Sequence, residues 1–283
     1  LPTDQRVEDG GSALFESREL TETVEIHGAP VIELELSSDK PVAMVAVRLV
    51  DVAPDQTATR VTYGVLNLCH RNSHEHPEPL TPGKKETVQV TLNDIAHSFK
   101  AGHRIRLAVS TVYWPLAWAS PEPVKLTIYP ENSRLTLPVR KSQPIDDELP
   151  AFQDPEVFDA PQPVEVTPSD KKWTVTHDIG EGKVTLETVD EASKLYFKET
   201  GHDLYSKAVE RYSYKGNQFD SLRGEVEYVW ALNRDDWQIQ TKTRTVVTCD
   251  KDNFYIYATL DAYEKDEHVF TKTWDRTIRR ELV

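Results

Sequence analysis

The chain has 283 residues, of which 38% are hydrophobic and 28% charged, and its 47 acidic and 33 basic side chains give a formal net charge of −14. This length suits two domains of about 100–150 residues, each with a core of its own. The negative charge repels phosphate backbones and anionic membranes, so we expect no nucleic-acid and no membrane partner. No apolar run approaches the roughly 18 residues of a membrane span.

Apolar and polar residues alternate in short runs through residues 1–140, and turn residues separate the runs. Such period-two alternation is typical of half-buried strands. About eight strands predict an N-terminal jelly-roll β-sandwich over residues 1–140. We expect one short helical turn, at residues 93–100. The expected strands are residues 24–26, 31–36, 42–50, 60–68, 85–92, 103–110, 124–129 and 135–139.

Residues 141–169 contain six prolines among acidic side chains. Because proline removes a backbone donor and restricts the chain, this density predicts an extended linker. We expect Phe152, Val157 and Phe158 to hold the linker on the protein surface.

Longer alternating runs return after the linker, and short polar turns such as Gly180-Glu181-Gly182 join them. Short links require antiparallel pairing, because parallel strands need long crossovers. Residues 170–283 are therefore predicted to form an antiparallel β-meander domain with strands at 173–177, 183–189, 209–214, 224–232, 237–247, 253–263 and 267–278. We expect cross-strand core pairs from its alternating aromatic residues Trp230, Trp237, Tyr255, Tyr257 and Trp274.

No serine lies in a Gly-x-Ser-x-Gly nucleophile elbow, and Gly10-Gly11-Ser12 only looks similar. Cys69 and His70 are adjacent, so on a strand they would point to opposite faces. Cys69 and Cys249 are the only cysteines. We interpret them as buried hydrophobic side chains in a reducing cytoplasm, with one long-range disulfide as the alternative. We expect no catalytic residue and no cofactor in this chain.

The best metal candidate is the group His70, His74 and His76, with Glu75 between the last two. Three imidazoles can form a zinc site of the catalytic type. These residues lie in a polar stretch bounded by Pro77, however, and a loop of this kind binds transition metals weakly and without selectivity. We expect a solvated loop and no metal site, with an independent metalloenzyme as the alternative.

Tyr113, Trp114 and Trp118 lie together in a proline-bounded loop, residues 112–121. Exposed aromatic side chains can form a docking surface or a platform that stacks against sugars. The alternative is a plug that caps one end of the sandwich. We expect this loop to be a docking or pocket-wall surface.

Several motifs of the first half resemble, in their order, the C-terminal jelly-roll domain of the X-prolyl dipeptidyl-peptidase and cocaine-esterase family of hydrolases. The resemblance covers about residues 10–140, and a weaker one links Trp274-Asp275-Arg276 to a C-terminal extension of some bacterial members. The motifs are Leu49-Val50-Asp51-Val52-Ala53-Pro54-Asp55, Gly64, Arg71, Pro79-Leu80-Thr81-Pro82-Gly83, Phe99-Lys100-Ala101-Gly102-His103-Arg104-Ile105-Arg106, Ser110 and Trp114-Pro115.

The resemblance implies an α/β-hydrolase domain with a Ser-Asp-His triad ahead of Leu1 in the same parent chain. No catalytic residue of the family then falls on this sequence. The only methionine is Met44, which agrees with a piece of a longer protein. The implied function is that of a non-catalytic region of a serine hydrolase of esters or X-Pro peptides, supporting the substrate pocket and homo-oligomer contacts. The alternative is a stand-alone jelly-roll module that binds carbohydrate or protein.

Two polar residues of these motifs have expected structural roles. His103 is expected to form structural hydrogen bonds and not to act as an acid or base. Asp51 is a candidate partner for a buried arginine.

Overall fold

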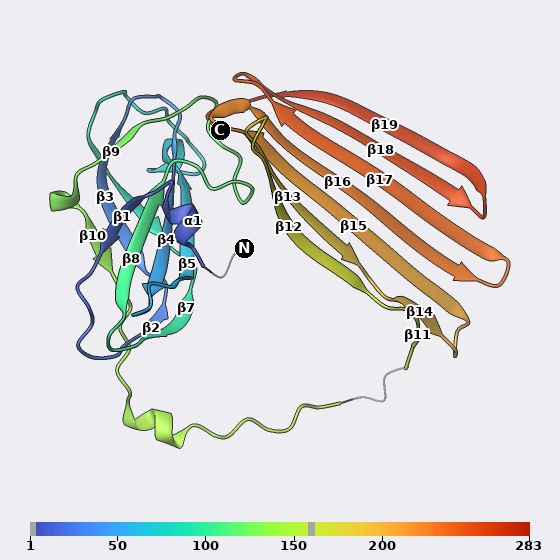
Figure 1. Cartoon of the computed structure of the whole chain (residues 1–283), viewed down its shortest axis with the longest axis horizontal. Helices are drawn as coiled ribbons and strands as arrows, with labels where there is room; N and C mark the ends of the chain where they lie inside the picture. Colours follow the sequence, from blue (N-terminus) through green and yellow to red (C-terminus); the bar gives the residue numbers. More distant parts are fainter. Residues whose placement is uncertain (1–3, 158–161) are drawn as a thin grey trace. The chain divides into compact units, whose positions relative to one another are not determined.

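The structure, a computed structural model, describes residues 4–157 and 162–283. All strand pairs among these residues are antiparallel, which confirms the predicted all-β class (Figure 1). The chain divides into two compact units. The first runs to Phe152 and includes Leu282 and Val283, and the second is Gln153–Glu281. The domain boundaries drawn from the sequence stay a prediction.

The first unit is a sandwich of two antiparallel sheets. One sheet has the strand order β1-β8-β4-β5 and the other the order β10-β3-β6, with β9 also paired to β3. A separate pair joins β2 and β7. The elements are α1 (Arg6–Asp9), β1 (Ala13–Glu16), β2 (Val24–Gly28), β3 (Val31–Ser38), β4 (Met44–Val52), β5 (Ala58–Asn67), η1 (Leu68–His70), β6 (Glu86–Thr91), β7 (Ile95–Phe99), β8 (Arg104–Ser110), β9 (Leu126–Ile128), η2 (Pro130–Asn132), β10 (Arg134–Thr136) and η3 (Pro144–Glu148).

The core of this unit lies between the two sheets. Strand β4 is buried along its whole length, and its alternate residues Val45, Val47 and Leu49 belong to the core. Gly64 lets β5 approach the end of β6 and the residue that follows it, because a Cβ at this position would lie 2.8 Å from both Thr91 O and Leu92 Cδ2. Other fully buried side chains are Ile32, Leu36, Leu68, Val90 and Phe99.

Residues 93–100 contain a strand and not the predicted helical turn. Strand β7 pairs with β2, and its burial alternates with a period of two. Alternation over only five residues is too short to distinguish from one turn of helix in the sequence. The sequence also gave no indication of α1 and β1, because the four residues of β1 are mostly exposed and show no apolar alternation.

The predicted linker, residues 141–169, is not wholly irregular. It contains η3, whose N-terminus is capped by Gln143 and Asp146, and the edge strand β11 (Val164–Thr167) between Pro163 and Pro168. Phe152 and Val157 are almost fully exposed, so they do not hold the linker on a surface as expected. Phe158 lies outside the described residues.

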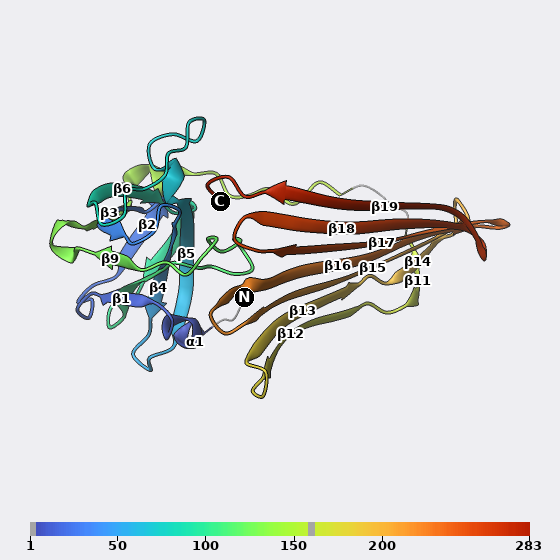
Figure 2. The same ribbon diagram turned by 90° about the horizontal axis from the view of Figure 1, so that it is seen from above.

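The second unit is one nine-stranded sheet, and its consecutive pairing through β15–β19 confirms the predicted antiparallel meander. Strands β13 and β14 both pair with β15, β12 pairs with β13, and β11 pairs with β14. Figures 1 and 2 show these strands side by side in one layer. The strands are β12 (Asp170–Asp178), β13 (Lys183–Glu191), β14 (Lys194–Phe197), β15 (His202–Lys215), β16 (Gln218–Arg234), β17 (Trp237–Cys249), β18 (Asn253–Glu264) and β19 (Glu267–Arg279).

The predicted aromatic core pairs of the second unit are wrong. Trp230 pairs across strands with Thr241, and Tyr257 pairs with Val246. Trp230, Trp237, Tyr255 and Tyr257 are all 40–43% exposed. Both hydrophobic core clusters of the described chain lie in the first unit, so the second unit does not form the core that its length predicted. A single layer has no facing sheet against which aromatic side chains could pack.

The described chain contains no helix with the length and apolar character needed to cross a membrane.

Candidate functional site

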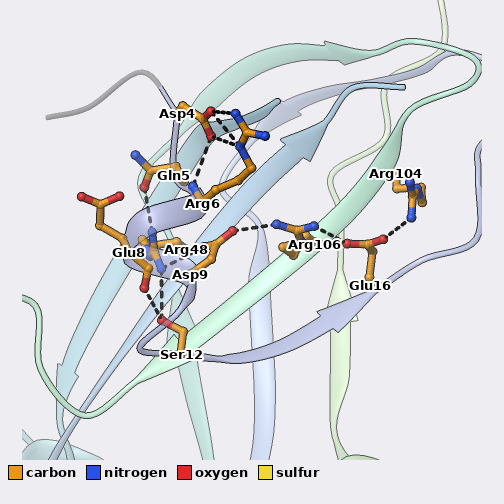
Figure 3. Close-up of polar contacts among 10 residues, drawn as sticks. All are labelled: Asp4, Gln5, Arg6, Glu8, Asp9, Ser12, Glu16, Arg48, Arg104 and Arg106. Atoms are coloured by element: carbon orange, nitrogen blue, oxygen red, sulfur yellow. Dashed lines mark hydrogen bonds and ion pairs between the residues drawn. The ribbon is translucent and has the colours of Figure 1, made fainter. Parts of the chain in front are cut away.

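The outer face of the β1-β8-β4-β5 sheet carries a buried charge in its centre. Arg48, on β4 between the core residues Val47 and Leu49, points away from the core, and its side chain is 3% exposed. Its Nη2 lies 3.0 Å from Oδ1 of Asp9, the last residue of α1, whose side chain is also 3% exposed. Arg48 also donates to Gln5 Oε1 at 2.8 Å and to Ser12 Oγ at 3.1 Å (Figure 3).

A second arginine extends this network across β8. Arg106 donates from Nη1 to Asp9 Oδ2 at 2.7 Å and from Nε to Glu16 Oε2 at 2.8 Å. Glu16, on β1, also accepts from Arg104 Nη1 at 2.6 Å (Figure 3). Burial lowers the pKa of Arg106, but the hydrogen bonds to Asp9 and Glu16 outweigh it, so the pKa is raised above its ordinary value.

This ionic network fixes the segment of residues 4–16 on the sheet. Asp9 and Arg48 are not among the predicted site residues, although the sequence contains one signal for them. Arg48 is a charged residue inside the apolar run of β4, and a charge that is buried on a strand needs a partner. The partner itself could not be found, because α1 is too short to give a recognisable pattern.

Asp51, at the end of β4, is held between two histidines. His103 Nδ1 lies 2.8 Å from Oδ1 of this carboxylate, and His97 Nε2 lies 3.0 Å from Oδ2. His103 therefore has the structural hydrogen-bonding role expected for it. The prediction of an arginine partner for Asp51 is wrong, because the arginines of the neighbouring strand β8 pair with Asp9 and Glu16 instead.

The aromatic loop after β8 is attached to the outer face of the same sheet through Tyr113. The Tyr113 hydroxyl accepts from Arg60 Nη1 at 2.5 Å, and its ring meets the Tyr63 ring edge-on, with centroids 5.3 Å apart. The rings of Trp114 and Trp118 also meet edge-on, at 4.8 Å. All three predicted docking residues are half-buried, and the neighbouring Leu116 is 46% exposed. The docking role of Tyr113, Trp114 and Trp118 stays a prediction.

Residues 70–77, which we call the histidine loop, do not form a metal site. His70 and His74 approach each other, with their Nδ1 atoms 3.4 Å apart, whereas His76 is exposed beside Glu75. Among the residues that the structure describes, no group of three or more His, Cys, Asp or Glu side chains could hold a metal ion. Cys69 and His70 lie on the short helix η1 and not on a strand, and the half-buried His70 follows a buried cysteine. Cys69 and Cys249 are both buried and neither forms a disulfide, so the disulfide alternative is wrong.

Arg71 closes the base of the histidine loop. It donates from Nη1 to the carbonyls of Leu68 and Glu78, at 3.0 and 2.9 Å, and pairs with Glu86 on β6. Burial raises the pKa of Glu86, but hydrogen bonds from Lys84 and Arg71 outweigh it and leave the pKa below its ordinary value of 4.5.

A pH dependence follows from this pair. Since the pKa of Glu86 is lower in the folded state, its contribution to stability is present above pH 4.5 and is lost as the pH falls through the folded-state pKa. Glu86→Gln should therefore make the free energy of unfolding of the first unit less dependent on pH below 4.5. Denaturant titrations of both proteins at neutral and acidic pH measure this difference. If the two proteins show equal pH dependence, the pKa of Glu86 is not lowered by folding.

These features define a class of protein module: an antiparallel β-sandwich in which the buried polar residues form ion pairs and hydrogen bonds that connect its strands and loops. The chain belongs to the family of the X-Pro dipeptidyl-peptidase C-terminal non-catalytic domain, which matches residues 2–148. This agrees with the resemblance that its sequence motifs indicate.

Individual relatives match a similar part of the chain. Cocaine esterase from Rhodococcus sp. (strain MB1 Bresler) is 31% identical over 116 residues, which are 40% of this chain and 20% of that protein. The chain therefore matches only a fifth of the length of this relative. A selenomethionine-labelled α-amino acid ester hydrolase is similar over 48% of this chain and 27% of its own, with 28% identity and a TM-score of 0.46. An aminopeptidase from a marine sediment Thaumarchaeota archaeon is similar over 49% of this chain and 27% of its own, with 20% identity and a TM-score of 0.46.

Proposed function

We propose that the first unit is the accessory domain of a serine hydrolase of esters or X-Pro peptides, and that it packs on an α/β-hydrolase domain of the same parent chain. The observation that carries the proposal is the family match over residues 2–148 to a domain described as C-terminal and non-catalytic. The name of the similar cocaine esterase supports ester hydrolysis as the reaction of the parent enzyme.

The aromatic loop is the proposed contact with the catalytic domain. Tyr113 attaches it to the sheet through Arg60, so the loop has a fixed base. Its two tryptophans and Leu116 provide apolar area, and partly exposed aromatic side chains on a rigid base are typical of interface anchors. In this position the loop supports the wall of the substrate pocket without contributing a catalytic group.

A fluorophosphonate probe for serine hydrolases tests the first part of the proposal. We expect no labelling of this chain, and labelling of a chain extended upstream through its native coding sequence. Labelling of the 283-residue chain by itself would overturn the proposal. Binding of soluble glycans that is lost in Trp114→Ala would favour a carbohydrate-binding module instead.

Leu116→Asp tests the contact itself, because this side chain is exposed and its replacement should leave the first unit folded. In the extended chain we expect Leu116→Asp to lower both the melting temperature and kcat/KM, since an aspartate would be buried in the contact. Val139→Asp is the matched control, because Val139 is also exposed, at 55%. Equal effects of the two substitutions would contradict the role of the loop.

A further inference from the structure

The nine-stranded sheet of the second unit has two faces of opposite chemistry. Residues paired directly across antiparallel strands share a face, so the register assigns every side chain to one side. The first side, which we call the ionic face, contains the cross-strand ion pairs Arg211 with Glu187 and Glu227, at 2.6 and 3.0 Å, and Arg244 with Glu225 at 2.6 Å.

The second side, which we call the apolar face, is described best by three rows of residues that cross β12, β13 and β15–β19. The first row is Val175, Leu186, Tyr212, Gly224, Val247, Ile256 and Arg276. The second is Trp173, Thr188, Glu210, Val226, Thr245, Ala258 and Trp274, and the third is Lys171, Asp190, Ala208, Tyr228, Thr243, Leu260 and Lys272.

Large side chains on the apolar face are exposed in the described chain. Trp173 is 65% exposed, Val175 57%, and Trp230, on the same face of β16, 41%. Within the described residues of this unit no second layer lies on the sheet. Large apolar side chains that are exposed on one face of a sheet indicate a contact site, because their burial is the main favourable contribution to association.

The charges on the apolar face indicate which partner fits it. In the three rows, β16, β17 and β18 carry no charged side chain. On the β12–β15 side Asp190 is paired with Lys171 at 3.1 Å, so the net acidic charge comes from Glu210. The β19 side has two basic residues, Lys272 and Arg276. The apolar face is thus neutral in its middle, and its two sides carry charge of opposite sign. This pattern is found although the whole chain has a formal net charge of −14.

We propose that the apolar face pairs with the same face of a second copy of this chain. A two-fold axis parallel to the strands places the basic β19 side of one copy over the acidic β12–β15 side of the other, and the two neutral middles against each other. The two sheets then form the aligned sandwich that sheet packing favours, with about 10 Å between the layers. A two-fold contact of this kind is self-complementary and closed, so it gives a dimer.

The first experiment measures the mass of the full chain by sedimentation over a range of concentrations. We expect a dimer, and for Leu260→Glu a dissociation constant at least about tenfold higher, because the change places a carboxylate in the neutral middle of the face. The matched control is Thr259→Glu, since this neighbour lies on the ionic face opposite Arg244. A monomer at every concentration would overturn the proposal, and so would equal effects of the two variants.

A second pair of variants covers the case in which Leu260→Glu fails to fold. Trp230 is exposed on β16, within the neutral middle of the apolar face, so Trp230→Glu should fold, and Val229→Glu is its control on the ionic face. We expect dissociation only in Trp230→Glu. A Trp230→Glu chain that folds and stays as dimeric as Val229→Glu would show that the dimer uses another surface.

Charge reversal tests the orientation of the two copies. Lys272→Glu with Arg276→Glu should weaken the dimer, and Glu210→Lys in the same chain should strengthen it again, because these residues face each other only when the axis is parallel to the strands. If Glu210→Lys weakens the dimer further, the proposed arrangement is wrong.

Discussion

Replacing Arg48 with methionine is expected to lower the free energy of unfolding of the first unit by about 3–5 kcal/mol, because the substitution leaves the Asp9 carboxylate buried without one of its two arginine partners. Arg48 also satisfies Gln5 and Ser12, so these side chains lose a donor as well. Hydrogen exchange at the amides of β4 in the full chain measures the effect, since β4 is the most completely buried strand of that unit.

Arg6→Met is the matched control for this prediction. Arg6 pairs with Asp4 on the surface, with side chains 57% and 34% exposed, and exposed ion pairs contribute little to stability. We expect no change in β4 exchange for this variant. If Arg48→Met has no larger effect than Arg6→Met, the network does not hold the segment of residues 4–16 on the sheet.

Phe99→Ala is expected to cost about 3–5 kcal/mol of unfolding free energy through the cavity that it leaves in the core. Phe99 is fully buried, and its ring meets the His97 ring edge-on at 4.7 Å. The measurement is a denaturant titration of the first unit within the full chain, followed by exchange at β2 and β7.

Phe152→Ala removes the same atoms from a side chain that is fully exposed, so it should leave stability unchanged. Similar losses in the two variants would mean that the strand β7 is not part of the core.

Much of the first unit could be predicted because its strands alternate clearly. Strands β3, β4, β5, β6 and β8 lie within about two residues of their predicted bounds, as local alternation is a direct consequence of one face being buried. The ionic network could not be predicted. Asp9 and Arg48 are 39 positions apart, and only the packing of α1 on the outer face of the sheet brings them together.

In the second unit the strands could be predicted, but the burial of their side chains could not. Its strands and meander order follow from alternation and short turns, but alternation reports only that the two faces differ. It does not report whether a second layer covers the apolar one. Trp230 and Trp237 were therefore assigned to a core that the nine-stranded layer does not have within its own described residues.

The attachment of α1 through Asp9 has a mechanical consequence. A pulling force applied at residue 4 is transmitted through Asp9 to Arg48 in the middle of β4 and to Arg106 on β8 before it reaches the backbone hydrogen bonds between β1 and β8. The load is then shared by the hydrogen bonds of β4 with both β5 and β8, which must slide past one another in shear. A chain held only through β1 would instead peel from the edge of the sheet, one hydrogen bond at a time.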